Sequence, residues 1–151
     1  MAAVDAERFP PLPEKAAAAW ARFGDWGDRT YFPKLVGLVV DEVRADYCRM
    51  RLPYRSELDQ PHGAVHGGAI ATLLDSVVVP AVGAAYGPDW RYATVSMHVD
   101  FLGAVAGEDL VADGWVEQRG RSIVFCRAEA ATAAGRRVAH ASLVYKVSPP
   151  R

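Results

Sequence analysis

The chain has 151 residues, of which 51% are hydrophobic and 23% charged, a composition typical of one globular domain with a substantial core. Its formal net charge is −1, so no overall positive field exists to attract nucleic acid or an anionic membrane. Basic and aromatic residues do not interleave in any stretch, which argues against a nucleic-acid module. We therefore expect any anionic ligand to be bound by a local site.

The two cysteines, Cys48 and Cys126, lie in strand-like stretches without a CxxC pattern. They are interpreted as free thiols in a reducing cytosol, which predicts a cytoplasmic protein. The segment Met1–Pro13 has no apolar run, so no signal peptide is expected. The most membrane-like stretch, Ala64–Ala85, is interpreted as a buried helix because it contains His66, Asp75 and Pro80.

The first part of the chain indicates an extended arm followed by a short helix. Prolines mark the arm up to Pro13, and the Ala-rich run Glu14–Phe23 predicts the helix. We divide the chain into this N-terminal part, residues 1–30, and a main domain, residues 31–151. At the start of the main domain, Leu38–Leu52 alternates between apolar and polar residues, which predicts one or two strands with a bend near Asp46.

The segment from His66 to about Tyr86 predicts a long helix. It is rich in Ala and Leu and apolar nearly all round, so we expect it to be buried. Gly87 followed by Pro88 is a typical helix end. Pro80 is expected to kink the last turns or to end them early.

The rest of the chain is predicted to form the strands of a sheet. Between Ala93 and Phe101, apolar and polar residues alternate, which predicts a half-buried strand with Ala93, Val95, Met97, Val99 and Phe101 on its inner face. Further strands are predicted at 110–118, 122–132 and 138–147, with hairpin turns at 119–121 and 134–136. The elements predict an α+β fold in which a curved, mostly antiparallel sheet of five or six strands wraps around a long central helix, the hotdog arrangement.

A motif at the start of the predicted helix carries a family resemblance. The segment reads Gly63-Ala-Val-His66-Gly67-Gly68, with Asp75 nine positions after the histidine, and the next strand contains Thr94-Val-Ser-Met-His-Val-Asp-Phe101. This pattern resembles the hotdog thioesterases of the phenylacetic-acid-pathway (PaaI-like) type, over roughly residues 35–147. The resemblance implies hydrolysis of acyl- or aryl-coenzyme A thioesters to the free acid and coenzyme A.

The resemblance has one departure. The family commonly has Asn six positions before the histidine, where this chain has Gln60. A related branch, similar to one type of 4-hydroxybenzoyl-CoA thioesterase, has Gln there but pairs it with Glu. This chain combines Gln60 with Asp75.

Gly67 and Gly68 begin the predicted helix, where free N–H groups and the helix dipole favour negative charge. The N–H of Gly67 is a candidate oxyanion donor, worth about 3 kcal/mol in the transition state, and Gly68 a candidate contact for the substrate. The alternative interpretation is that the two glycines let the helix pack closely.

Asp75 lies among apolar residues, where an ionised carboxylate costs several kcal/mol unless it is partnered. Such a residue is either a structural hydrogen-bond hub or functional, and the motif favours function. Its role would be general base toward water, or nucleophile through a mixed anhydride. The sequence leaves both open.

Three further residues are candidates. Gln60 would orient the water or the thioester oxygen, unless it is an exposed loop residue. Thr94 could hold the attacking water, although threonine is common in strands. For His66 we favour a structural role, ordering the loop through its ring nitrogens. His62 and His66 lack a third ligand at a convincing spacing, so no metal is expected.

The spacing of the motif predicts a dimer. Nine helical residues turn through about 900° and rise about 13.5 Å, so Asp75 faces away from His66. If Gly67 and Asp75 serve one carbonyl, they must come from different chains of a two-fold homodimer. The resemblance implies the same sharing, and two dimers could pair into a tetramer.

Coenzyme A carries phosphates, so a binder needs local cations. The segment Arg119-Gly120-Arg121-Ser122 offers them, and the family often places a basic-Gly-basic turn near the phosphates. The alternative is a solvated hairpin tip. No P-loop or dinucleotide-binding glycine pattern occurs, so no cofactor is expected. Two alternative functions stay open: a non-catalytic acyl-CoA-binding hotdog protein, and a hotdog hydratase or dehydratase, which would need a histidine paired with an acid.

Overall fold

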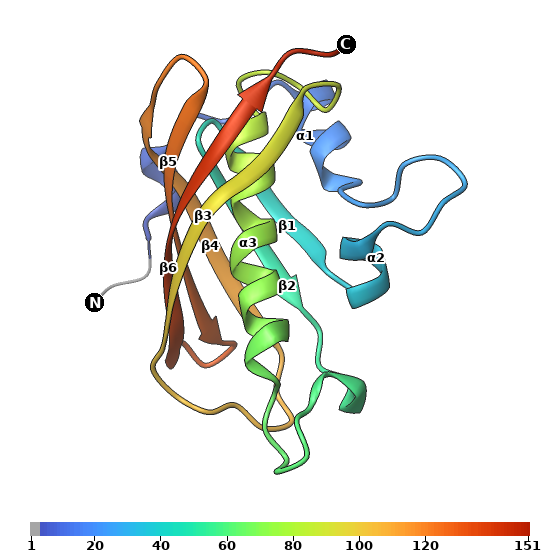
Figure 1. Ribbon diagram of the computed structural model, residues 1–151, viewed down its shortest axis with the longest axis vertical. Helices are drawn as coiled ribbons and strands as arrows, with labels where there is room; N and C mark the ends of the chain where they lie inside the picture. Colours follow the sequence, from blue (N-terminus) through green and yellow to red (C-terminus); the bar gives the residue numbers. More distant parts are fainter. Residues whose placement is uncertain (1–3) are drawn as a thin grey trace.

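The computed structural model describes residues 4–151 and has a curved antiparallel sheet wrapped around one long helix (Figure 1). The six strands lie in the order β1-β2-β4-β5-β6-β3, and every neighbouring pair is antiparallel. The strands are β1 (Val39–Arg44), β2 (Tyr47–Leu52), β3 (Arg91–Phe101), β4 (Leu110–Arg119), β5 (Ile123–Thr132) and β6 (Arg137–Ser148). The predicted α+β hotdog architecture is thus confirmed.

The turns fall where the sequence predicted them. Between β1 and β2, Asp46 adopts the left-handed conformation, with φ 63°. Residues 120–122 connect β4 to β5, and Gly135, with φ 85°, lies in the turn between β5 and β6. Asp and Gly tolerate positive φ better than most residues, which explains their positions.

The long helix is α3 (Gly67–Gly83). Its N-cap residue, His66, is extended (φ −61°, ψ 134°), and its imidazole Nδ1 accepts a hydrogen bond from the Gly68 N–H at 2.8 Å. Pro80 lies inside the helix, which continues to Gly83 and then ends before the predicted Tyr86. Pro80 was predicted to kink the last turns or to end them early, and the helix ends three residues after it.

The inner face of α3 packs directly against the middle of the sheet. Leu73, Leu74, Val77 and Val78 are fully buried there, and burying a side chain of this size contributes about 1.5–3 kcal/mol. The helix approaches most closely at Gly114 of β4, where an added Cβ would lie 2.8 Å from Val77 Cγ1. A glycine is therefore required at this crossing.

The outer face of α3 is not covered within one chain. Gly68, Thr72, Asp75 and Val79 follow each other at helical spacing, and none of them is buried. The prediction that the helix is buried on all sides is wrong for the single chain, because the sheet curves around one side of it. We call these four residues the open stripe of α3.

The N-terminal arm and the helix after it cover the β1 edge of the sheet. This helix is α1 (Glu14–Ala21), whereas α2 (Phe32–Val36) lies at the start of the main domain. Short 3-10 turns lie at Ala6–Arg8 in the N-terminal part and at Ser56–Leu58 in the main domain. The predicted first helix is confirmed, whereas α2 was not predicted. The Pro10 carbonyl accepts a hydrogen bond from the Ala45 N–H at 2.9 Å, and Pro11 bridges to Arg44 at the end of β1. The first residues of the predicted arm, Met1–Ala3, lie outside the described residues.

The opposite edge strand, β3, is open and does not have the predicted burial. Val95 and Phe101 are 59% and 53% exposed. The predicted alternation is also interrupted, because Thr94 pairs with Tyr145 and Ser96 with Val144, which leaves Val95 as an extra residue in a β-bulge. The bulge moves Thr94 to the helix side of the sheet, together with Met97 and Val99 beyond it.

Two smaller predictions concern the two cysteines and the apolar stretch Ala64–Ala85. Cys48 and Cys126 are free and buried, as predicted, and burial raises the pKa of Cys126 to about 12, so this thiol stays protonated. Within residues 4–151, none of the helices combines the length and apolar character needed to span a membrane.

Candidate active site

Two hydroxyl groups hold the carboxylate of Asp75 on the open stripe of α3. Thr94 donates from Oγ1 to Asp75 Oδ1 at 2.8 Å, and the Tyr145 hydroxyl lies 2.6 Å from the same oxygen. The Tyr145 hydroxyl is also 2.7 Å from the Asp75 backbone carbonyl oxygen. No residue in the described part of the chain donates a hydrogen bond to Asp75 Oδ2. One carboxylate oxygen is therefore anchored, and the other faces the open side.

Tyr145 is a functional candidate that sequence reasoning missed. It is 1% exposed and lies on the inner face of β6. Burial, together with the nearby Asp75 carboxylate, raises the pKa of its phenol well above the usual range, so the phenol remains a hydrogen-bond donor. In the sequence, Tyr145 occupies an apolar position of an alternating strand and has no feature that distinguishes it from a core residue.

The bulge in β3 decides where Thr94 points. Without the extra residue Val95, strand alternation would place Thr94 on the face opposite Met97 and Val99, away from Asp75. Thr94 was predicted to hold the attacking water. In the structure its hydroxyl proton is directed to Asp75, while its oxygen still has lone pairs that can accept a hydrogen bond.

The other predicted groups gather at the N-terminal end of α3. Gln60 and Gly67 line an open hollow of about 410 Å³ together with Phe101. The Gly68 N–H is occupied by His66, but no hydrogen-bond acceptor for the Gly67 N–H is found among the described residues. Gln60 accepts from the His62 N–H at 2.7 Å, which leaves its NH2 group as the available donor. This end therefore provides hydrogen-bond donors.

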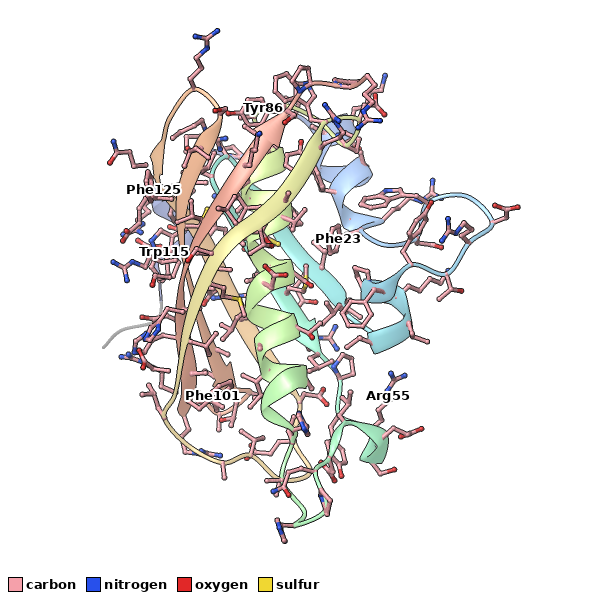
Figure 2. All side chains as sticks on the ribbon, viewed as in Figure 1. Phe23, Arg55, Tyr86, Phe101, Trp115 and Phe125 are labelled. Atoms are coloured by element: carbon pink, nitrogen blue, oxygen red, sulfur yellow. The ribbon has the colours of Figure 1, made fainter. Side chains whose placement is uncertain are left out.

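The two halves of the site lie apart within one chain. Thr94 marks the Asp75 half, and Phe101, whose ring is 3.5 Å from the Cβ position at Gly67, marks the Gly67 half. Figure 2 shows Phe101 beside the first turn of α3. Thr94 and Phe101 are seven positions apart along β3, a distance of roughly 23 Å in an extended strand. The structure therefore does not bring Asp75 and Gly67 of the same chain together.

The four residues of the predicted phosphate-binding turn, Arg119 to Ser122, have different roles in the structure. Arg119 forms an ion pair with Asp46, and its guanidinium lies 5.0 Å from the centre of the Tyr86 ring, so it is held in the fold. Gly120 donates to the Ile123 carbonyl at 2.8 Å, and a Cβ there would touch that same oxygen. Ser122 accepts from the Val147 N–H through its carbonyl. Arg121 is exposed and forms no ion pair within the described chain.

Strand pairing places two further cations on the strands beside Arg121, which precedes β5. Arg91 on β3 pairs with Ser148 on β6, and the Val147 N–H of β6 donates to the carbonyl of Ser122, the residue after Arg121. Lys146 lies two residues along β6. All three side chains are exposed, and none has a carboxylate partner among the described residues. We call Arg91, Arg121 and Lys146 the basic cluster.

Residues 4–151 contain no group of three His, Cys, Asp or Glu side chains placed to hold a metal ion. The exposed His98 and the half-buried His140 both approach Asp100, with Nε2 to carboxylate distances of 3.3 and 3.6 Å. His66 is used as the cap of α3. Its Nδ1 contact orders the first turn of α3.

The family model of the thioesterase superfamily matches residues 62–139, more than half of the chain and all of the segment from His66 through β3. The protein belongs to the thioesterase superfamily. A curated relative from Halobacterium salinarum, named as an esterase, is 32% identical over 93 residues, which are 58% of this chain and 61% of the relative. The match thus spans less than two thirds of that relative's length.

Solved structures share the fold. A thioesterase family protein from Silicibacter pomeroyi is 26% identical, with a TM-score of 0.71, over 76% of this chain and 87% of that protein. The PaaI protein of the E. coli phenylacetic acid degradation operon is 18% identical, with a TM-score of 0.71, over 78% of this chain and 84% of that protein. The resemblance to PaaI-like hotdog thioesterases is confirmed at the level of family and fold.

Proposed function

We propose that the protein hydrolyses acyl- or aryl-coenzyme A thioesters to the free acid and coenzyme A. The observation that carries this proposal is the Asp75 carboxylate, which two hydroxyl groups anchor through Oδ1 while Oδ2 faces the open side. A half-buried carboxylate with one free oxygen is suited to accept a proton from water or to attack a carbonyl. Membership of the thioesterase superfamily supports the thioester as the bond that is cleaved.

The open edge of β3 supports a homodimer. A long edge strand presents unpaired N–H and C=O groups, which natural proteins usually cover. The β1 edge is covered by the N-terminal arm, whereas β3 exposes Val95 and Phe101. A second copy that pairs with β3 in antiparallel orientation about a two-fold axis near Met97 would bring its Phe101 end to Thr94.

Such pairing would build two complete sites, each from two chains. The Gly67 N–H and the Gln60 amide of one chain would face the thioester oxygen, and Asp75 of the other chain would face the carbonyl carbon. In the general-base form of the reaction, water attacks that carbon and gives its proton to Asp75 Oδ2. The oxyanion accepts a hydrogen bond from Gly67. The C–S bond then breaks, the departing sulfur takes the proton from Asp75, and the thiol and the acid are released with Asp75 ionised again.

Thiol release from a panel of acyl- and aryl-coenzyme A esters tests the proposal. We expect the wild-type protein to release coenzyme A from at least one ester with Michaelis–Menten saturation. Binding of acyl-CoA without release from any ester would support the non-catalytic alternative. Formation of a 3-hydroxyacyl-CoA from an enoyl-CoA, without thiol release, would support the hydratase alternative.

The basic cluster is proposed to bind the phosphates of coenzyme A. Replacing Arg121 by alanine is expected to raise KM for an acyl-CoA about fivefold to tenfold, because a charge-assisted hydrogen bond is lost. The same acyl group carried on pantetheine, which lacks the nucleotide, should be hydrolysed equally by the variant and the wild type. Lys15→Ala, which removes an exposed cation from α1, serves as the control. Equal KM increases for both substrates would contradict the assignment.

A further inference from the structure

We infer that Tyr145 is a positioning residue for Asp75, which selects Oδ2 as the oxygen that acts on water or substrate. The inference rests on the proposed function. It adds a residue on β6 to a site otherwise built from α3, β3 and the loop before α3.

Tyr145 contacts two oxygens of Asp75. Its hydroxyl lies 2.7 Å from the backbone carbonyl oxygen and 2.6 Å from Oδ1, so its single proton is shared between these two acceptors. Since Thr94 donates to Oδ1 as well, at 2.8 Å, the carboxylate cannot rotate without losing two hydrogen bonds. Charge-assisted hydrogen bonds of this kind are about twice as strong as neutral ones.

The strand register and the buried neighbours of Tyr145 hold the two hydroxyl groups in place. Thr94 and Tyr145 are cross-strand partners, so the β3–β6 register holds the two hydroxyls beside each other. Tyr145 is 1% exposed and flanked on its own strand by the buried residues Leu143 and Val147, which prevents its ring from swinging away. Its phenol keeps its proton throughout the working pH range, because burial and the neighbouring carboxylate both disfavour the phenolate.

The functional consequence concerns the two oxygens of the carboxylate. Oδ1 carries two donors, which reduces its basicity, whereas Oδ2 has no donor among the described residues. Proton transfer or nucleophilic attack therefore falls to Oδ2.

Tyr145→Phe tests the inference, because it removes the hydroxyl and keeps the buried ring. We expect kcat to fall about tenfold with little change in KM, since Asp75 Oδ1 loses a donor and the carboxylate is held less firmly. A readout independent of turnover is a crystal structure of the variant, in which the Asp75 carboxylate should no longer keep its wild-type orientation.

Tyr47→Phe is the matched control. Tyr47 is also fully buried, and its hydroxyl donates to a carboxylate oxygen of Asp113, at 2.5 Å, away from the site. It should lose comparable thermal stability and leave kcat and KM unchanged. An unchanged kcat in Tyr145→Phe, or an equal loss of kcat in Tyr47→Phe, would overturn the inference. If the wild type releases no thiol, the proposed function fails, and the orientation of the Asp75 carboxylate in the Tyr145→Phe crystal structure decides whether Tyr145 positions it.

Discussion

Asp75→Asn is expected to lower kcat by a factor of about 10² or more, with KM changed little. Both hydroxyls that contact Asp75 Oδ1 are donors, so the amide oxygen of Asn should take the Oδ1 position and its NH2 group the Oδ2 position. The variant therefore replaces the working oxygen with a group that can neither accept a proton nor attack a carbonyl. Steady-state thiol release measures the effect.

The amide is nearly isosteric, so the fold should be retained. Asp113→Asn provides a matched control, since Asp113 likewise accepts from a tyrosine hydroxyl and also pairs with Arg49 at 2.8 Å. That variant should lose stability on thermal unfolding and keep the wild-type kcat. An Asp75→Asn enzyme with wild-type kcat would remove Asp75 from the chemistry and refute the mechanism.

The second large effect is expected at Gly67, where proline would delete the proposed oxyanion donor. Gly67→Pro should lower kcat by about 10²–10³-fold, which is the cost of removing one such donor. Gly67 is the first residue of α3, a position at which proline is favoured in helices, and the preceding His66 has ψ 134°, which suits a residue before proline. The helix should therefore form normally, as circular dichroism and thermal unfolding would check.

Gly67→Ala is the control for this variant, because it keeps the N–H group. Its Cβ would meet the Phe101 ring at 3.5 Å, an ordinary contact, so most of the kcat should remain. Equal losses of kcat in the alanine and proline variants would indicate a steric effect and contradict the role of the N–H.

The two inactive variants together test whether the site is shared. If Gly67 and Asp75 of different chains form one site, a mixed dimer of Gly67→Pro and Asp75→Asn has one intact site and one doubly altered site. Co-refolding the variants in equal amounts should therefore restore about a quarter of the wild-type activity. Mixtures that stay inactive, although hybrid dimers have formed, would place both residues in one chain's site.

Much of this fold was predictable because its signals are local. The Ala- and Leu-rich segment ending near Gly87 predicted α3, and alternating strands with Gly-containing turns predicted β4, β5 and β6. The short helix α2 was missed, since five residues are too few for a helical period to be seen. The motif from Gly63 to Asp75 also identified the site region, because its residues are close in sequence.

What the sequence could not determine depends on contacts between distant segments. Alternation along β3 predicted the wrong face for Thr94, because a bulge arises from the pairing with β6 and leaves no mark on β3 itself. Tyr145 was missed for the same reason, since its partner Asp75 is 70 residues away. Arg119 was assigned to phosphate binding, but its pairing with Asp46 required the β2–β4 neighbourhood.

The amino-acid sequence by itself determined the family motif, the central helix and the carboxylate, because each is encoded within one continuous segment of the chain. The tertiary structure alone decided which groups surround that carboxylate. Sheet register aligns Tyr145 with Thr94, the bulge turns Thr94 toward Asp75, and the curvature of the sheet leaves the stripe bearing Asp75 uncovered. These are long-range consequences of strand pairing, which depends on the whole sheet and not on any one strand.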